Sequence, residues 1–317
     1  MISVVQLGTV DYATGLALQQ QLVALRKEEK IGDVLLLLEH SPVITLGRNA
    51  RAANVVASRE LLKQRGVELF ECDRGGDVTF HGPGQIVGYP IFDLRGFATP
   101  DGKRKTLGVI EFVRRLEDVL MRTCADFAIP TKRVPGLTGV WTAAEDSNAH
   151  VGTAAPGRPV EQSSTAIASS AKQFDDEHER EGHDFSRAIR GFGKDRASAA
   201  EGTNLEAKLA AIGVHISRFI TSHGFALNVN TDLSYFNLII PCGITSKPVT
   251  SMQQQLVREL NLNAVAESIS RNFGVVFGSQ ILWVDTLDAL LGRTVGVPMK
   301  PPAELRHLHK EDDTTWA

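Results

Sequence analysis

The stretch Arg74-Gly-Gly-Asp-Val-Thr-Phe-His-Gly-Pro-Gly-Gln85, which runs on to Tyr89-Pro90, is the most distinctive part of this 317-residue chain. Its glycines allow positive φ angles and close approach of the backbone to a ligand. A dinucleotide-binding loop does not fit, because Pro83 interrupts the glycine pattern and a strand-like segment, not a helix, follows. A glycine-rich hairpin remains an alternative. The polar residues Arg74, Thr79 and His81, on a loop that joins apolar strands, favour a binding site.

Outward from this loop, the sequence alternates strand-like and helix-like segments. Helices are expected at 12–30, capped by Asp11 and apolar along Leu16, Leu22, Val23 and Leu25, and at 262–273. A third helix is expected at 107–127, from the spacing of Ile110, Val113, Leu116, Leu120, Cys124 and Phe127. The expected strands are 2–7, 34–38, 43–46, 67–72, 78–89, 235–240 and a pair, 214–220 and 225–229, around a His-Gly turn. This mixture predicts an α/β or α+β sheet domain.

Composition limits the class of protein. The chain is 43% hydrophobic and 22% charged, as in soluble globular proteins, and its net charge of −3 argues against general nucleic-acid binding. No apolar run approaches the ~20 residues of a membrane-spanning helix, and the first residues do not resemble a secretory signal. Three cysteines, an odd number, do not form a disulfide framework, so we expect a cytoplasmic protein with reduced thiols.

Residues 143–203 differ from the rest of the chain. They are rich in Ala, Gly, Ser and charged residues and poor in aliphatic ones, which predicts a disordered insertion. His178 and His183 lie there among acidic residues, but without an apolar frame we expect no metal site. We therefore expect one catalytic domain made of 1–142 and 204–280, followed by a C-terminal extension, 281–317.

The three cysteines have different surroundings. Cys124 lies on the apolar stripe of a predicted helix and Cys72 ends a strand, so both are expected to pack in the interior. Cys242 follows an apolar run and precedes Gly243, and by composition alone a buried structural thiol is the default. A free thiol of pKa near 8.5 is only about 3% thiolate at pH 7, so a nucleophilic cysteine needs a nearby cation. Lys208 is a candidate if it points inward; a lysine at a strand start otherwise lies on the surface.

Taken together, these segments resemble the lipoyl(octanoyl) transferases. The loop 74–85 with Tyr89-Pro90 is similar to the signature of that family, and five more segments match it in the expected order. They are Leu37-Leu-Glu-His40 with Thr45-Leu-Gly-Arg48, Gly139-Val-Trp-Thr142, Lys208-Leu-Ala-Ala-Ile-Gly213, Ser222-His-Gly-Phe-Ala-Leu-Asn228 and Ile240-Pro-Cys-Gly-Ile244. The resemblance covers residues 2–278 apart from 143–203, which is the chief departure from the family pattern.

The resemblance implies a biotin/lipoyl protein ligase-like fold, in which a mixed sheet flanked by helices surrounds an acyl-binding tunnel. It implies that Cys242 is the nucleophile, that Lys208 favours its thiolate, and that neither metal nor cofactor is needed. The implied substrate-binding residues are Arg74, Gly75, Gly76, Asp77, Val78, Thr79, Phe80 and His81, then Ala211, Ile212 and Gly213, then Gly224, Phe225 and Ala226.

The implied activity moves an octanoyl group from octanoyl-acyl carrier protein to a lysine of a lipoyl domain, the first step of endogenous protein lipoylation. The acceptors would be the lipoyl domains of 2-oxoacid dehydrogenases and the glycine-cleavage carrier protein, served by a monomer. Lys103-Arg104-Lys105 with Arg114-Arg115 offers a basic patch for an acidic carrier, or merely an exposed turn and helix face. Two alternatives remain: an ATP-dependent lipoate or biotin ligase of the same fold, and a non-catalytic carrier-binding module.

Overall fold

The computed structural model describes residues 1–99, 106–143, 206–286 and 290. Within them, a mixed eight-stranded sheet has the order β11-β1-β2-β6-β10-β9-β8-β7, and a smaller sheet has the order β4-β3-β5. The large sheet consists of β1 (Ile2–Val10), β2 (Asp33–His40), β6 (Gln85–Ile91), β7 (Thr131–Val134), β8 (Leu137–Thr142), β9 (Lys208–Ser217), β10 (Ile220–Asn228) and β11 (Ile281–Trp283). The small sheet consists of β3 (Val43–Leu46), β4 (Glu68–Glu71) and β5 (Val78–His81).

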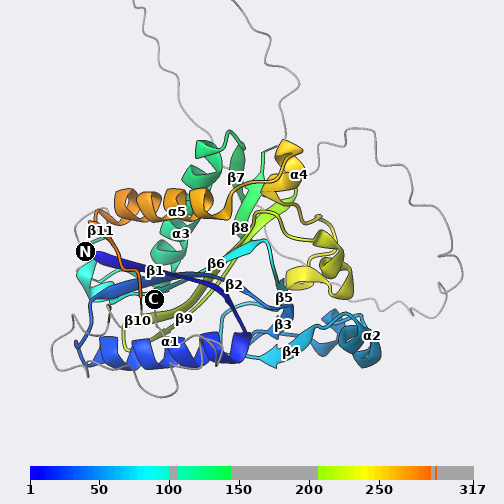
Figure 1. Cartoon of the computed structure of the whole chain (residues 1–317), viewed down its shortest axis with the longest axis horizontal. Helices are drawn as coiled ribbons and strands as arrows, with labels where there is room; N and C mark the ends of the chain where they lie inside the picture. Colours follow the sequence, from blue (N-terminus) through cyan, green and yellow to red (C-terminus); the bar gives the residue numbers. More distant parts are fainter. Residues whose placement is uncertain (100–105, 144–205, 287–289, 291–317) are drawn as a thin grey trace, which may run out of the picture. The chain divides into compact units, whose positions relative to one another are not determined.

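Helices cover both faces of the large sheet (Figure 1). On one face, α3 (Val109–Asp126) and α5 (Leu262–Phe277) pack over a core that includes Phe112, Phe273 and Phe277. On the other face, α1 (Tyr12–Lys27) buries Leu18 and Leu22 against the strands. The short helices are α2 (Arg59–Gln64) and α4 (Met252–Leu256), with 3₁₀ turns η1 (Ala52–Asn54), η2 (Leu94–Gly96), η3 (Leu233–Leu238) and η4 (Pro241–Gly243). A mixed sheet with helices on both sides confirms the predicted fold class.

The predicted faces of two helices were partly wrong. Asp11 caps α1 as expected, accepting a hydrogen bond from the Thr14 amide, but the helix ends at Lys27 and buries a different stripe. That stripe consists of Tyr12, Gly15, Leu18, Gln19 and Leu22. In α3 the expected core residue Ile110 is 76% exposed, whereas Phe112, in the same first turn, is fully buried. Spacing located both helices but did not fix how each one is rotated against its neighbours.

The chain between β9 and the cysteine loop also differs from expectation. The turn of the β9–β10 hairpin is at Arg218-Phe219, both with positive φ, whereas His223 and Gly224 lie inside β10. Two consecutive positive φ angles are what a two-residue hairpin requires, although neither residue type favours them. The expected strand 235–240 is mostly the 3₁₀ turn η3, which begins at Asp232, whose carboxylate accepts from the Ser234 amide.

The predicted domain boundaries can be compared with the sheet at two places. The sheet extends past residue 280, because β11 pairs with β1 in parallel, so the predicted boundary there cuts off an edge strand. The predicted insertion, 143–203, lies outside the described residues except Ala143. Its flanks lie side by side, since Thr142 and Ala207 exchange two hydrogen bonds, Ala207 N to Thr142 Oγ1 at 3.0 Å and Thr142 N to Ala207 O at 2.9 Å.

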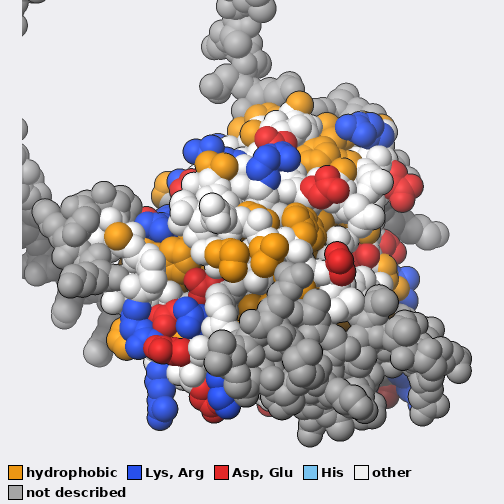
Figure 2. Space-filling model, turned by 60° about the vertical axis from the view of Figure 1, so that its left-hand side comes forward, with side chains coloured by type: hydrophobic (Ala, Val, Ile, Leu, Met, Phe, Trp, Pro, Cys, Tyr) orange, Lys and Arg blue, Asp and Glu red, His pale blue; other side chains and the backbone are white. Residues whose placement is uncertain are grey.

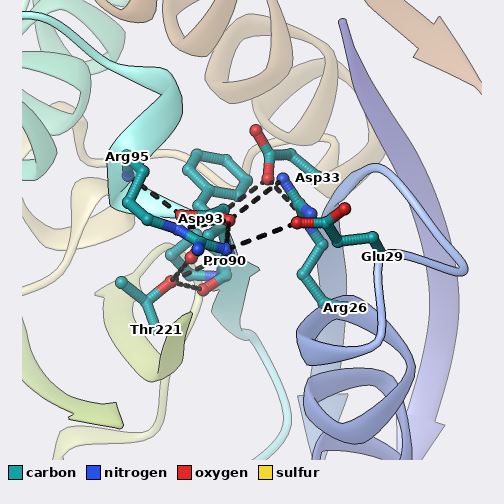
Figure 3. A network of polar contacts seen from close by, with 8 residues as sticks. Arg26, Glu29, Asp33, Pro90, Asp93, Arg95 and Thr221 are labelled. Atoms are coloured by element: carbon teal, nitrogen blue, oxygen red, sulfur yellow. Dashed lines mark hydrogen bonds and ion pairs between the residues drawn. The ribbon is translucent and has the colours of Figure 1, made fainter. Parts of the chain in front are cut away.

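A polar network holds the end of the sheet where β6 finishes and β10 begins (Figure 3). Arg26 at the end of α1 forms ion pairs with Asp33 at 2.9 Å and Asp93 at 3.8 Å. Thr221, fully buried, donates to Pro90 O at 2.6 Å and accepts from the Phe92 amide at 2.9 Å. These contacts lock β6 against β10 at this end of the pair.

On the face shown in Figure 2, basic and acidic side chains of the described residues are interspersed, as the small net charge suggests. None of the described helices is both long enough and apolar enough to cross a membrane.

Candidate active site

A cavity of about 520 Å³ lies where the small sheet meets β9 and β10 of the large sheet. It brings together Cys242, Lys208 and most of the binding residues expected from sequence. Those lining it are Arg74, Gly75, Gly76, Asp77, Thr79, His81, Ala211, Ile212, Gly213, Gly224, Phe225 and Ala226. The loop containing Gly75 crosses β9 directly at Gly213, where a Cβ atom would be 2.6 Å from Gly75 O. A side chain at 213 would therefore lift the loop away from the cavity.

Cys242 lies on the η4 turn in a left-handed conformation, with φ 54° and ψ 20°. Such a backbone is uncommon for a residue with a side chain and costs of order 1 kcal/mol or more. It is enriched at functional sites, although in this chain Glu29 and Val257 also adopt it away from the cavity. The turn is tied to the glycine-rich loop, because Ile240 N donates to Asn54 O and the Asn54 amide donates to Asp77 Oδ2 at 2.5 Å. These contacts hold the thiol at the cavity wall.

Lys208, the first residue of β9, points its ammonium at this thiol. Its Nζ lies 3.2 Å from Cys242 Sγ and 5.1 Å from the centre of the Trp141 ring, and the side chain is almost fully buried. Among the residues that the structure describes, Lys208 makes no ion pair with a carboxylate. A buried cation whose nearest polar neighbour is a thiol is stabilised by the thiolate form of that thiol.

Arg74 anchors the glycine-rich loop and is itself buried. Its guanidinium donates to Thr45 O at 2.7 Å, Thr45 Oγ1 at 2.9 Å, Asp77 O at 2.7 Å and Gly75 O at 3.1 Å. All these acceptors are neutral, so the arginine fixes the loop's shape while its charge remains uncompensated beside the cavity.

Strand alternation divides the remaining loop residues between two sides. Thr79 and His81 face the cavity, whereas Val78 and Phe80 are buried in the core of the small sheet. Successive side chains of a strand point to opposite faces, so β5 cannot present all four to a ligand. The resemblance had implied Val78 and Phe80 as binding residues. In the structure their side chains point into the core of the small sheet and do not line the cavity.

Two neighbouring buried histidines, His40 and His81, are neutral, and His81 lines the cavity. His40 donates from Nδ1 to Val10 O at 2.7 Å and accepts at Nε2 from the Tyr89 hydroxyl at 2.6 Å. His81 donates from Nδ1 to Gln85 Oε1 at 2.8 Å, which leaves Nε2 as an acceptor. Burial lowers the pKa of His40 to about 4, and burial together with the neighbouring His40 and Arg74 lowers the pKa of His81 to about 3.

A third group joins the loop to β9 and β10. The carboxylate of Asp73 bonds His223 Nε2 at 2.7 Å and also contacts His215 Nδ1. Partial burial opposes ionisation, but hydrogen bonds from the two imidazoles lower the pKa of Asp73, and burial lowers the pKa of His223 despite the carboxylate. His223 lines the cavity, so this bridge fixes the position of the wall it forms.

Sequence reasoning missed several other lining residues: Tyr12, Asn49, Arg51, Asn54, Val87, Tyr89, Gly136, Leu137, Thr138, His223, Gly243 and Ile244. Tyr89 and His223 lie within the motifs that resemble the family, so the sequence could have indicated them as lining residues. Tyr12 and Leu137 belong to elements that reach the cavity only through tertiary packing, which the sequence does not show.

The other cysteines behave as expected. Cys124 is fully buried in the α3 core, where burial raises its pKa to about 12. Cys72 is half-buried and donates to Leu46 O at 3.5 Å.

Within the described residues, no cluster of three or more His, Cys, Asp or Glu is arranged to hold a metal. Arg114 and Arg115, expected in a basic patch, form ion pairs with Glu117 and Glu111, and the patch's other residues, 103–105, lie outside the described ranges.

The mixed sheet, the glycine-rich loop that crosses it and the cavity between them define the class of this protein, an α+β domain with a ligand-sized cavity at its sheet. The chain belongs to the family of lipoyl protein ligase A/B catalytic domains, whose model matches residues 11–274.

Relatives and solved structures agree with this membership. The chain is 50% identical to an octanoyltransferase of Koribacter versatilis over 98% of both chains, and 46% identical to one of Acidobacterium capsulatum over 92% of this chain and 96% of the relative. The fold is similar to the bipartite lipoate protein ligase of Thermoplasma acidophilum, with TM-score 0.56 and 11% identity over 91% of this chain and 88% of the other. A lipoate-protein ligase A bound with ATP gives TM-score 0.53 and 10% identity over 97% and 92%.

Proposed function

We propose that this protein is an octanoyltransferase that moves an octanoyl group from octanoyl-acyl carrier protein to a lysine of a lipoyl domain. The observation that carries the mechanism is the 3.2 Å contact between Lys208 Nζ and Cys242 Sγ at the wall of the cavity. The two relatives named octanoyltransferase, each covered almost end to end, support the choice of acyl group.

In the first step, the Cys242 thiolate attacks the thioester carbonyl of the donor. A carbon–sulfur bond forms to Cys242, the donor's carbon–sulfur bond breaks, and the carrier leaves as a thiolate that takes up a proton. Lys208 supports this step because its ammonium stabilises the thiolate before attack and can supply a proton to the leaving sulfur. The cavity, lined by Ala211, Ile212 and Phe225 along the strands, would hold the alkyl chain.

In the second step, the neutral amine of the acceptor lysine attacks the octanoyl-Cys242 thioester. A carbon–nitrogen bond forms, the bond to Cys242 breaks, and the amine's proton returns to the Lys208–Cys242 pair. His81 is suited to hold the substrate but not to carry this proton, because its low pKa keeps it neutral at pH 7 and a poor base. The proposed acceptors are the lipoyl domains of 2-oxoacid dehydrogenases and the glycine-cleavage carrier protein.

The proposal places a monomer in the cytoplasm, with residues 1–142 and 204–280 as its catalytic domain and 281–317 as an extension whose first residues add strand β11 to the sheet. Two features support it: all three cysteines are free thiols, and one chain supplies Cys242, Lys208 and the surrounding loops.

The direct test is intact-protein mass spectrometry after mixing with octanoyl-acyl carrier protein and no acceptor. We expect the mass of one octanoyl group on Cys242, located by peptide mapping, and we expect Cys242→Ala to abolish both adduct and transfer. Cys124→Ala is the matched control and should alter stability alone. An adduct on Cys72 or Cys124, or turnover without any adduct, would contradict the covalent mechanism. Labelling of a lipoyl domain from free octanoate only when ATP is present would favour the ligase alternative.

A further inference from the structure

Glu117 is a buried carboxylate on α3 that the proposed mechanism does not use. Its side chain is fully buried, and Oε2 accepts from Arg114 Nη1 at 2.7 Å and from Arg133 Nε at 2.8 Å. Its other oxygen, Oε1, accepts from the backbone amide of Gly139 at 3.1 Å. Burying a carboxylate costs free energy unless hydrogen-bond donors surround it. Glu117 has three such donors, one each from α3, β7 and β8, and together they fix the position of its carboxylate.

Gly139 lies in an irregular part of β8. Between the pairs Lys132–Trp141 and Val134–Leu137, three residues of β8 face the single residue Arg133 of β7. On the other side, β9 also shifts register, because Val140 pairs with Ala210 while Trp141 pairs with Lys208. Such bulges leave backbone amides without a strand partner, and here the Glu117 carboxylate accepts from one.

The irregular segment forms the wall against which Lys208 lies. Gly139 has φ +122°, and a Cβ atom there would be 2.5 Å from Ala210 O and 3.0 Å from Lys208 Cε. Trp141, two residues along, places its ring 5.1 Å from Lys208 Nζ. The methylene chain of Lys208 therefore lies between Gly139 and Trp141. From there its ammonium reaches Cys242 Sγ.

We infer that Glu117 is a positioning residue, which holds the Gly139 bulge in the one arrangement that aims Lys208 at Cys242. This inference rests on the proposed function, because it assumes that Lys208 activates Cys242. Glu117 touches neither substrate nor the reacting sulfur, so it acts through Gly139 and Lys208.

The test is the rate of alkylation of Cys242 by iodoacetamide across pH 6–10, quantified by peptide mapping on the folded protein. Lys208→Ala sets the reference and should slow alkylation at pH 7 by about ten-fold or more. Glu117→Met, similar in length but unable to accept a hydrogen bond, should slow it by about five-fold and shift the profile toward alkaline pH. In steady-state turnover, Glu117→Met should have a lower kcat. Its KM for the donor should stay within about two-fold, since Glu117 does not contact the bound donor.

Two further variants separate positioning from stability. Glu117→Asp keeps the charge beside the arginines but is one methylene too short to reach Gly139, so it should slow alkylation like Glu117→Met even if the latter does not fold. Asp118→Asn is the control: it removes the other carboxylate bound by Arg133, at 2.6 Å, without touching Gly139, and should leave the profile unchanged.

The outcomes are distinguishable. If both Glu117 variants alkylate like the unaltered protein while Lys208→Ala is slow, the inference is wrong and the activation of Cys242 by Lys208 stands. If Lys208→Ala also alkylates normally, the activation step of the proposed function fails, and the inference fails with it.

Discussion

At the scale of single residues, the site contains buried titratable groups, two of which are histidines whose pKa values burial lowers strongly. His40 and His81 are neutral, each with its tautomer set by one fixed partner, Val10 O or Gln85 Oε1. Lys208 is almost fully buried, and its Nζ lies 3.2 Å from Cys242 Sγ. The neutral histidines matter for this arrangement, because an additional buried positive charge would repel Arg74 and Lys208.

These histidines predict how stability depends on pH. An unfolded histidine binds a proton near pH 6.5, whereas folded His40 and His81 bind one only near pH 4 and 3. The unfolded state therefore holds more protons between about pH 4 and 6.5, and the free energy of unfolding falls as the pH is lowered through that window. His40→Gln should flatten the slope by up to about 1.4 kcal/mol per pH unit, measured by urea unfolding at several pH values. Parallel slopes for the variant and the parent protein would show that His40 is protonated in the folded state.

At the scale of elements, pairing between β6 and β10 positions the cavity, and the network of Figure 3 secures the end of that pairing away from Lys208. The Arg26 ion pairs join α1 to the same end. The cavity wall itself is held by the Asp73 carboxylate at His223 and by strand pairing at Gly224 and Ala226.

Thr221→Val tests the strength of this lock. Valine matches threonine in shape, but it leaves the Phe92 amide and Pro90 carbonyl without the hydroxyl that both contact, at a position with no exposure. We expect a loss of about 2–4 kcal/mol in the free energy of unfolding, because each orphaned buried group costs about 1–3 kcal/mol. Thr9→Val, the same change at an exposed strand position, should stay within about 0.5 kcal/mol. Equal effects in denaturant unfolding would mean that the Thr221 hydroxyl contributes nothing specific.

Elements also show what sequence could and could not predict. The resemblance of the motifs around Arg74, Lys208 and Cys242 to those of a known family pointed to these residues. Spacing alone could not show that Lys208 and Cys242, 34 positions apart, lie together. The buried face of α1 was not predicted, since polar Gln19 takes a core position by accepting from the His223 amide, a contact 204 residues distant. The hairpin turn was misplaced because His223-Gly224 resembles a turn more closely than Arg218-Phe219 does.

At the scale of the whole molecule, residues 143–203 should be dispensable for chemistry. Cys242, Lys208 and every proposed binding loop lie outside them, and the flanking residues Thr142 and Ala207 are already hydrogen-bonded to each other. Replacing 143–203 with a short Gly/Ser linker should leave kcat within a few-fold and change mainly the KM for the carrier. Steady-state kinetics with octanoyl-acyl carrier protein would measure both. Failure to fold, or a hundred-fold lower kcat, would mean that the segment belongs to the site.

The contact between Thr142 and Ala207 also has a consequence for how the protein folds. The two residues are neighbours in the sheet but 65 positions apart in the chain, so the pairing of β8 with β9 is a non-local event. Folding slows as contacts join residues more distant in sequence. Lys208 is the first residue of β9, so its side chain would reach its place beside Cys242 only after a slow step of assembly. With a short connection the same strands would form a hairpin, and refolding should become faster although the native contacts stay the same.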